Sequence, residues 1–133
     1  MNNIDVSSQI TAIGDLAKSV GLTTRTLRYW EEVGIIESEE RADGAIRGYS
    51  PYFVRRIKFI IKLKYLGLTI KEMQDLYAAY GEAKETSQMI PKLIAILDKH
   101  TRMVDEKVSK LNSLRKEIVE YRQKMAQKHA EGN

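Results

Sequence analysis

The C-terminal part of this sequence is a long stretch without a helix-breaking residue. No proline or glycine occurs from Lys92 to Glu131, and Pro91 just before it suits the first turn of a helix. Such a helix would contain roughly 35 residues or more and extend about 50 Å. Its apolar side chains mostly alternate spacings of four and three, the heptad pattern of a coiled-coil seam, at Ile90, Ile94, Leu97, Val104, Val108, Leu111, Leu114, Ile118, Tyr121 and Met125.

A single helix cannot bury a seam of this length by itself. It either folds back on the N-terminal part of its own chain or pairs with a second copy. Pairing is favoured because the seam is long and the N-terminal part has apolar faces for a core of its own. The spacing leaves the orientation of the two helices open. The residues expected at the dimer interface are Ile94, Leu97, Val104, Val108, Leu111, Leu114 and Ile118.

Residues 16–22 have the spacing of a helix-turn-helix. Ala17 is small where two helices approach closely, and Gly21 supplies the turn. Thr23 or Thr24 can cap the second helix, because a threonine oxygen accepts hydrogen bonds from the free amides of the first turn. The residues with core spacing in this hairpin are Leu16, Val20, Leu22, Leu27 and Trp30.

A β-hairpin is predicted after the second helix. Asp43-Gly44 is a strong two-residue turn signal, since both positions tolerate positive φ. The flanking strands would span roughly 38–42 and 45–49, and residues 10–13 could pair briefly with another strand. The hairpin and the helix-turn-helix together predict a mainly α fold, a winged helix-turn-helix followed by the long C-terminal helix.

Two further helices complete the predicted N-terminal domain. Ser50-Pro51 opens the first, with a capping serine and a proline where its missing N–H is not needed. Thr69 and Glu72 form a capping box for the second, and Gly81 is expected to end it. The predicted organisation is a loose leader at 1–10, the winged helix-turn-helix at 11–81, a linker at 82–90, the coiled-coil helix at 91–128 and a tail at 129–133.

Basic residues gather in the middle of the chain, although its net charge is only +4. Seven basic side chains lie from Arg41 to Lys64, and Asp43 is the single acidic residue among them. Such a stretch can bind the phosphates of a nucleic acid even when the whole domain is near neutral. The same pattern also fits a solvated helix face, so charge alone does not decide between the two.

The second helix of a helix-turn-helix enters the major groove of DNA with its N-terminal residues toward the base edges. Arginine donates to guanine or phosphate there, and threonine bonds a base or a phosphate. Arginines of the wing and the third helix would contact the backbone. Tyr29 could instead be a packing residue, and one of Arg55 and Arg56 could pair with an acid of its own domain. The predicted DNA-binding residues are Thr23, Thr24, Arg25, Arg28, Tyr29, Arg47, Arg55 and Arg56.

Composition disfavours several other classes of protein. The chain has no cysteine, which excludes disulfides, thiolate metal sites and cysteine redox sensing. His100 and His129 lie in the charged helical segment and are expected on the surface, so neither a metal site nor a cofactor is expected. No nucleophile–histidine–acid set or phosphate loop can be assembled, so an enzyme is not expected. A cytoplasmic protein is expected, because no apolar run approaches a membrane span and residues 1–9 lack the features of a signal peptide.

Three segments resemble the MerR family of bacterial transcription regulators. They read IGDLAKSVGLTTRTLRYWEEVGII, RGYS and VRRIKFIIKLKYLGLTIKEMQDL, and they cover about Ile13 to Tyr80 in the family's order. Residues 25–31 are especially similar to the family's recognition helix, and Arg47–Ser50 is similar to its wing exit. Trp30 stands where the family usually has tyrosine.

The resemblance implies a homodimer held by an antiparallel pair of C-terminal helices. It implies binding to a dyad-symmetric operator in double-stranded DNA, between promoter elements that are spaced too far apart. An activating ligand would make the bound dimer bend and untwist the DNA so that RNA polymerase engages both elements, while some members repress. The missing cysteines separate this chain from the metal- and redox-sensing members and make it similar to a cysteine-free group of short regulators.

Two points stay open at this stage. An effector pocket is expected where the fourth helix meets the dimer helix, lined by Tyr77, Tyr80, Met89 and Leu93, although these residues could simply pack the junction. The alternative function is an architectural DNA-binding or adaptor protein that uses the coiled coil as its interaction helix. A long extra coiled coil or a membrane-binding tail would favour that alternative.

Overall fold

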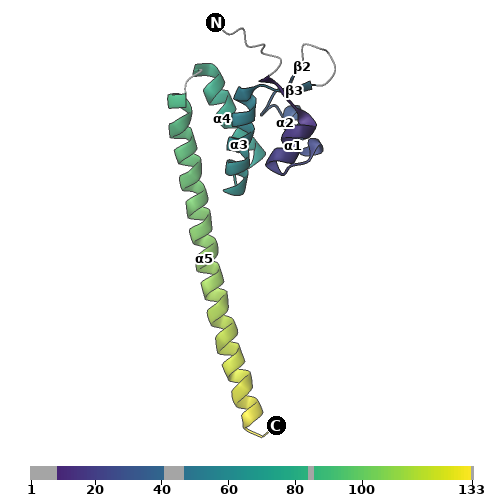
Figure 1. Ribbon diagram of the computed structural model, residues 1–133. Coiled ribbons are helices and arrows are strands. Elements are labelled where there is room, and N and C mark those ends of the chain that lie inside the picture. The colour runs from purple at the N-terminus through teal and green to yellow at the C-terminus, as the bar shows by residue number, and fades with distance from the viewer. Residues whose placement is uncertain (1–8, 41–46, 84–85, 133) are drawn as a thin grey trace. The chain divides into compact units, whose positions relative to one another are not determined.

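The computed structural model describes residues 9–40, 47–83 and 86–132 of the chain. It confirms the predicted mainly α fold (Figure 1). The chain divides into two compact units, Met1–Leu93 and Ile94–Asn133. The helices and strands within the described ranges are β1 (Thr11–Ala12), α1 (Ile13–Val20), α2 (Thr24–Glu32), β2 (Glu39–Glu40), β3 (Arg47–Tyr49), α3 (Pro51–Tyr65), α4 (Ile70–Ala83) and α5 (Thr86–Ala130).

The first two helices form the predicted helix-turn-helix. α1 ends at Gly21, whose φ of 74° lies in the left-handed region that glycine adopts without strain. The amide of Leu22 donates to the carbonyl of Ala17 over 2.9 Å and closes the turn. Thr23 caps α2 by accepting a hydrogen bond from the Thr26 amide at 3.1 Å. The two helices contact each other, and their buried residues are Leu16, Ala17, Leu27 and Trp30.

A small antiparallel sheet with the strand order β1-β3-β2 forms beside this hairpin of helices. β3 pairs with β1 through Thr11 and Tyr49 and with β2 through Glu40 and Arg47. The pairing of β2 with β3 was predicted as the two arms of the wing. Residues 10–13 were expected only to pair with another strand, which is β3. The predicted Asp43-Gly44 turn lies outside the described residues.

α3 and α4 begin where their capping residues predict. The Ser50 hydroxyl accepts a hydrogen bond from the Phe53 amide at 3.4 Å, and Pro51 is the first residue of α3. Thr69 and Glu72 form the predicted capping box. The Thr69 amide donates to the Glu72 carboxylate at 2.9 Å, and the Glu72 amide donates to the Thr69 hydroxyl at 3.1 Å.

Two helix boundaries differ from the sequence-based expectation. α4 continues through Gly81 to Ala83, so the prediction that Gly81 ends it was wrong. Glycine costs only about 1 kcal/mol in a helix interior and does not force termination. α5 begins at Thr86, five residues before Pro91, so helix covers much of the segment predicted as a linker. A proline this close to the helix start removes only the hydrogen bond that its missing N–H would donate to the Ser87 carbonyl.

The core of the N-terminal unit draws side chains from all four of its complete helices. The apolar residues that it buries are Leu16, Ala17, Leu27, Trp30, Ile35, Ile36, Tyr49, Ile57, Ile60, Leu63, Leu68, Met73 and Leu76. A hydrogen bond from the Gln74 amide to the Val33 carbonyl at 2.8 Å joins α4 to the end of α2. The core therefore fixes the rotation of α2 and leaves its other face in solvent.

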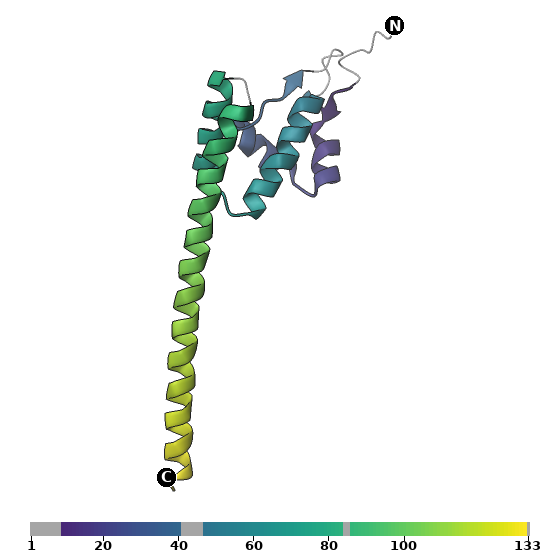
Figure 2. The same ribbon diagram turned by 90° about the vertical axis from the view of Figure 1, so that its left-hand side faces the viewer.

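α5 is one continuous helix of 45 residues (Figure 2), about 68 Å long at ~1.5 Å per residue. None of its described side chains is buried. Apart from the half-buried Leu97, the predicted seam is solvent-exposed along the single chain, with exposed fractions from 36% at Met125 to 64% at Leu111. An apolar stripe of this length on one helix is typical of a surface that another helix covers.

Gly48 should tolerate no side chain, because β3 approaches β1 closely at this residue. A Cβ there would overlap the carbonyl oxygen of Thr11 and lie 2.6 Å from Cγ2 of Ile10. We expect Gly48→Ala to separate β1 from β3 and to lower the free energy of unfolding by about 1–3 kcal/mol. Thermal unfolding followed by circular dichroism measures this, with Gly14→Ala as the control, since a Cβ at Gly14 meets nothing within 4 Å. Equal melting temperatures for the two variants would contradict the prediction.

Candidate nucleic-acid interface

The outward face of α2 carries the predicted base-reading residues. Arg25 and Arg28 are exposed and lie one turn apart, and Tyr29 beside them is 47% exposed. Leu27 and Trp30 occupy the opposite face and are almost completely buried. Because a helix presents residues three and four apart on one side, burial of one face directs both arginines and Tyr29 into solvent. Two cations and a hydroxyl can therefore approach a ligand from this helix.

The two predicted threonines lie at the start of α2, but their environments differ. The Thr23 hydroxyl accepts from the Thr26 amide and shares a 3.0 Å hydrogen bond with the Thr26 hydroxyl. Thr24 is the first residue of the helix and is half-buried. Thr23 therefore already stabilises the helix start, whatever it contacts in a complex.

A carboxylate joins α2 to the wing. Glu31 accepts hydrogen bonds from the Tyr49 hydroxyl at 2.8 Å and from the Ser38 hydroxyl. Burial, followed by this bond to Glu31, raises the pKa of the Tyr49 hydroxyl well above its ordinary value. The positive charges of Arg47 and Arg28 act in the opposite direction on the same hydroxyl, and both arginines border one groove between α2 and β3. The structure thus brings together the predicted arginines of the recognition helix and the wing.

Glu31 and Tyr49 were not among the predicted site residues. Tyr49 follows exposed Arg47 by two residues in a strand, with buried Gly48 between them. A segment this short gives little periodicity from which to assign faces. Glu31 carries no local signal at all, because its two partners lie seven and eighteen residues away in the sequence.

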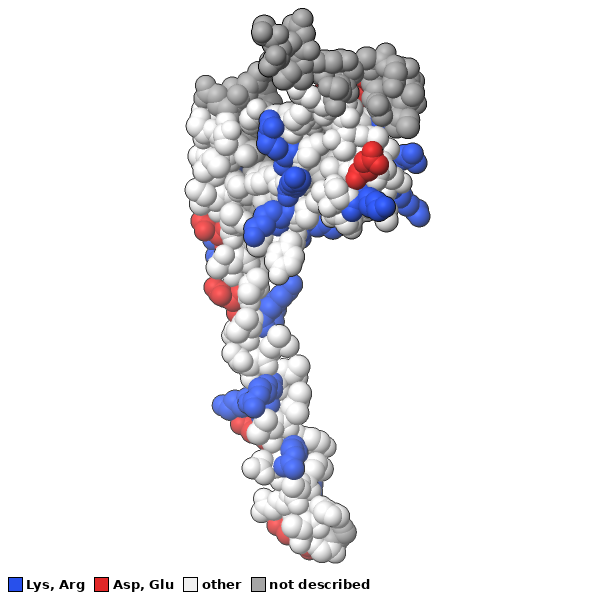
Figure 3. Space-filling model, in the orientation of Figure 1, with Lys and Arg blue, Asp and Glu red and all other residues white. Residues whose placement is uncertain are grey.

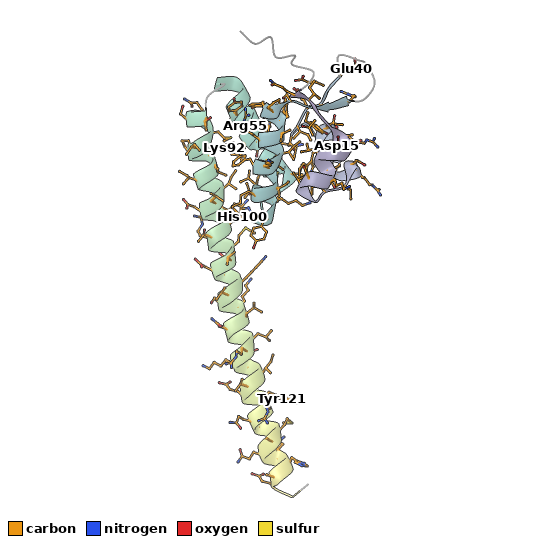
Figure 4. The ribbon with its side chains drawn as sticks, viewed as in Figure 1. Asp15, Glu40, Arg55, Lys92, His100 and Tyr121 are labelled. Carbon is orange, nitrogen blue, oxygen red and sulfur yellow. The ribbon has the colours of Figure 1, made fainter. Side chains whose placement is uncertain are left out.

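Arg55 and Arg56 are neighbours on α3 but have different environments. Arg55 is exposed, and Figure 4 labels it on α3. The Arg56 guanidinium lies over the Tyr77 ring and 5.3 Å from the centroid of the Phe53 ring. Burial lowers the pKa of Arg56 to about 10, so the group still carries its charge at neutral pH. Arg56 therefore faces aromatic side chains of its own domain, whereas Arg55 is free to reach a phosphate.

Basic side chains gather on one face of the N-terminal unit (Figure 3). They stand over α3 and over the α1–α2 hairpin, with little acidic surface among them in this view. On α3 the exposed basic residues are Arg55, Lys58, Lys62 and Lys64. A surface of this kind attracts a polyanion and holds its backbone without reading sequence.

A cavity of about 230 Å³ lies in the same unit, on the α3–α4 side. Tyr77, Tyr80 and Met89, three of the four residues predicted for an effector pocket, line it, and Leu93 does not. Tyr52 of α3 also lines the cavity and was not predicted. Its position at the second residue of α3, next to the capping serine, carries no sequence signal for a pocket.

Two other kinds of site receive no support from the described part of the chain. Its histidine, aspartate and glutamate side chains form no group of three or more that could hold a metal ion. None of the helices within the described ranges is long and apolar enough to cross a membrane.

A three-stranded wing, a helix-turn-helix and a basic outward helix face together define a winged helix-turn-helix DNA-binding protein. The chain belongs to the MerR family: residues 11–80 match the family model described as the MerR HTH family regulatory protein. Residues 54–121 match a second model, described as MerR, DNA binding. The protein is therefore a DNA-binding transcription regulator of this family.

Individual relatives agree with this assignment. The chain is 32% identical over 112 residues to the HTH-type transcriptional regulator ZntR homolog of Haemophilus influenzae, covering 84% of this chain and 81% of that protein. It is 26% identical over 106 residues to the regulator ZntR of Escherichia coli, covering 80% and 74% of the two chains.

Solved structures share the fold. The regulator PbrR691 of Ralstonia metallidurans, in complex with lead(II), superimposes with a TM-score of 0.68 at 24% identity and covers 86% of this chain and 87% of its own. HiNmlR, a MerR family regulator lacking the sensor domain and bound to promoter DNA, has a TM-score of 0.56 at 18% identity and covers 90% and 91%.

The Glu31 carboxylate should be needed to hold the wing against α2. We expect Glu31→Leu to lower the free energy of unfolding by about 1–3 kcal/mol, because the buried Tyr49 hydroxyl would lose its acceptor. Glu31→Gln should restore most of the loss, since its amide oxygen still accepts from Tyr49. Thermal or urea unfolding measures the effect, with exposed Glu32→Leu as the control. The assignment fails if Glu31→Leu and Glu32→Leu unfold at the same midpoint.

Proposed function

We propose that this regulator binds, as a homodimer, a dyad-symmetric operator between promoter elements, and that an effector makes it distort the bound DNA for RNA polymerase. The observation that carries the proposal is the outward face of α2, where Arg25 and Arg28 are exposed and Arg28 borders the same groove as Arg47 of the wing. A relative of the same fold, HiNmlR, is bound to promoter DNA. The effector is not held by thiolates, because the chain contains no cysteine.

The arginines divide into two proposed roles. Arg25 and Arg28 lie on the helix that enters the major groove, where a guanidinium can donate two hydrogen bonds to the edge of a guanine. Arg47 and Arg55 lie on the wing and on α3, and we assign them to the phosphate backbone. Tyr29, Thr23 and Thr24 complete the proposed interface near the start of α2. Arg56 was also predicted to contact DNA, but its stacking on Tyr77 favours a role inside the domain.

Replacing the two classes of arginine should have different effects on DNA binding. We expect Arg25→Ala to weaken operator binding about 5- to 150-fold and to relax preference at one base pair of each half-site. Arg55→Ala should weaken binding to all sequences and reduce the slope of log affinity against log salt by about 0.9 per copy. Titrations of labelled operator at several salt concentrations measure both effects. Lys71→Ala is the control, because Lys71 is exposed on α4 and its ammonium pairs with neighbouring Asp75 at 3.2 Å.

The operator for this test comes from fragments of the source genome selected by the purified protein at near-physiological salt. One recovered dyad motif within a promoter spacer supports the proposal, and scattered fragments without a motif support an architectural role instead. If Arg25→Ala binds the selected operator as tightly as the unchanged protein does, α2 is not the reading helix.

The homodimer is proposed from the exposed seam of α5. Val104, Leu111 and Ile118 are 56%, 64% and 59% exposed in the single chain, and they share one face at heptad spacing. Covering a leucine-sized side chain contributes about 1.5–3 kcal/mol, so a seam of this length is a strong driving force for pairing. A second copy offers the matching seam, and the resemblance to the family favours an antiparallel arrangement.

A charge placed in the seam should separate the two copies. We expect the unchanged protein to have about twice the 15.3 kDa mass of one chain in light scattering after size exclusion. Leu111→Lys should shift the protein toward the monomer, because its ammonium would be buried opposite apolar side chains. Ser113→Lys, two residues away and on the opposite side of the helix, should remain dimeric. A monomeric unchanged protein at micromolar concentration, or a dimeric Leu111→Lys variant, would contradict the proposal.

A further inference from the structure

The cavity between α3 and α4 has a lining of mixed character. Its volume is about 230 Å³. Apolar side chains form most of its wall, namely Phe59, Ile60, Leu63, Met73 and Leu76. The polar residues of the lining include Tyr52, Arg55, Arg56, Tyr80 and Thr86, and Tyr52 interacts with both Arg56 and Tyr80. A pocket that combines an apolar body with a few convergent polar groups is the usual form of a small-molecule site.

Arg56 supplies a charged donor that its own domain does not fully satisfy. Within the described residues its Nε is buried and has no hydrogen-bond partner. The exposed carboxylate of Glu37 acts on the Arg56 guanidinium electrostatically, but no ion pair between the two is found among the described residues. The guanidinium is stacked on Tyr77, which holds it in place but accepts no N–H in the plane of the group. A buried donor without an acceptor is costly, so a bound acceptor would be stabilised there.

The side chains of two tyrosines, Tyr52 and Tyr80, also line this cavity with Arg56. Tyr52 has hydrogen bonds with Arg56 and with Tyr80, and the bond to Tyr52 is the largest cause that raises the pKa of Tyr80. The Tyr80 hydroxyl therefore stays protonated at neutral pH, and both hydroxyls can donate to an anion. The three side chains come from α3 and α4, which the core of the domain holds together.

We propose that this cavity binds a small organic monocarboxylate, with its carboxylate on Arg56 and the tyrosine hydroxyls and its apolar body among the side chains of α3 and α4. A planar carboxylate matches the fork of a guanidinium, and the unpaired Nε–H is one arm of that fork. Two cations line the cavity, the half-buried Arg56 and the exposed Arg55, and the largely apolar remainder of the wall suits a small acid with a single charge better than a polyanion.

The volume limits the size of the acid. An apolar protein cavity of about 150 Å³ accommodates benzene. A cavity of about 230 Å³ therefore fits an acid of the size of benzoate or hexanoate. Binding of such an acid is independent of DNA, whereas its role as the effector rests on the function proposed above.

Calorimetric titration of the full-length protein without DNA tests the site, with sodium benzoate and sodium hexanoate as probes. We expect saturable binding of at least one acid at one site per chain. Benzamide and hexanol, the neutral counterparts, should bind at least tenfold more weakly, because they cannot form the charge-assisted hydrogen bonds. The proposal is overturned if an acid and its neutral counterpart bind with equal affinity. It is also overturned if neither acid shows saturable binding up to about 10 mM, a concentration chosen to detect even weak binding.

Variants locate the binding site. Arg56→Met should weaken binding of the acid about tenfold or more, and Lys58→Met should leave it unchanged, because Lys58 is exposed on the same helix and does not line the cavity. Tyr80→Phe removes one hydroxyl and should weaken binding about two- to tenfold, which keeps the test valid if Arg56→Met does not fold. Unchanged binding in folded Arg56→Met, or in Tyr80→Phe if Arg56→Met does not fold, would overturn the assignment.

Measurements of operator affinity test the effector role of the acid separately from its binding to the cavity. Its affinity is measured first without acid and then with a saturating concentration of the acid that binds. A change of threefold or more that is lost in Arg56→Met supports the acid as the effector. An unchanged affinity overturns the effector role but not the acid site, and absence of any specific operator overturns the proposed function alone.

Discussion

Leu27 and Trp30 lie on one face of α2 and are almost completely removed from solvent. Contacts with three neighbouring elements also hold α2 in this orientation. The Lys64 ammonium of α3 lies 5.9 Å from the centre of a Trp30 ring, and Gln74 of α4 donates to the backbone at the end of α2. Glu31 ties the same helix to the wing. A helix held on three sides has one rotation available, and that rotation puts the arginines outward.

The local parts of this fold were predictable because their signals are local. The Thr69–Glu72 capping box and the Ser50-Pro51 start each depend on residues within one helical turn, and both occur as predicted. Gly81 misled because its weak local preference against helix was outweighed by the apolar face of α4. Pro91 indicated a helix start there, but α5 begins five residues earlier, at Thr86. The helix propensity of one glycine contributes little to the free energy, so the apolar pattern of the surrounding helix decides where that helix ends.

The candidate site was predictable only where exposure follows from helix periodicity. Arg25 and Arg28 could be placed on the outward face because Leu27 and Trp30 define the inward one. Arg55 and Arg56 of α3 differ in burial for a reason that helix periodicity does not reveal. Arg56 meets an aromatic ring of α4, and only the tertiary packing brings that ring within reach. Contacts between elements that are distant in the sequence leave no recognisable pattern in one amino-acid sequence.

The first turn of α3 places the cavity and the DNA-binding surface within a few residues of each other. Tyr52, Arg55 and Arg56 line the cavity, Arg55 is also exposed, and Ser50 connects the helix to β3 of the wing. β3 carries Tyr49, whose hydroxyl reaches Glu31 on α2. A ligand can alter DNA affinity through this path only if it binds more tightly to one arrangement of the path than to another. The Arg56 guanidinium offers such a difference, since pairing with a carboxylate would compete with its stacking on the Tyr77 ring.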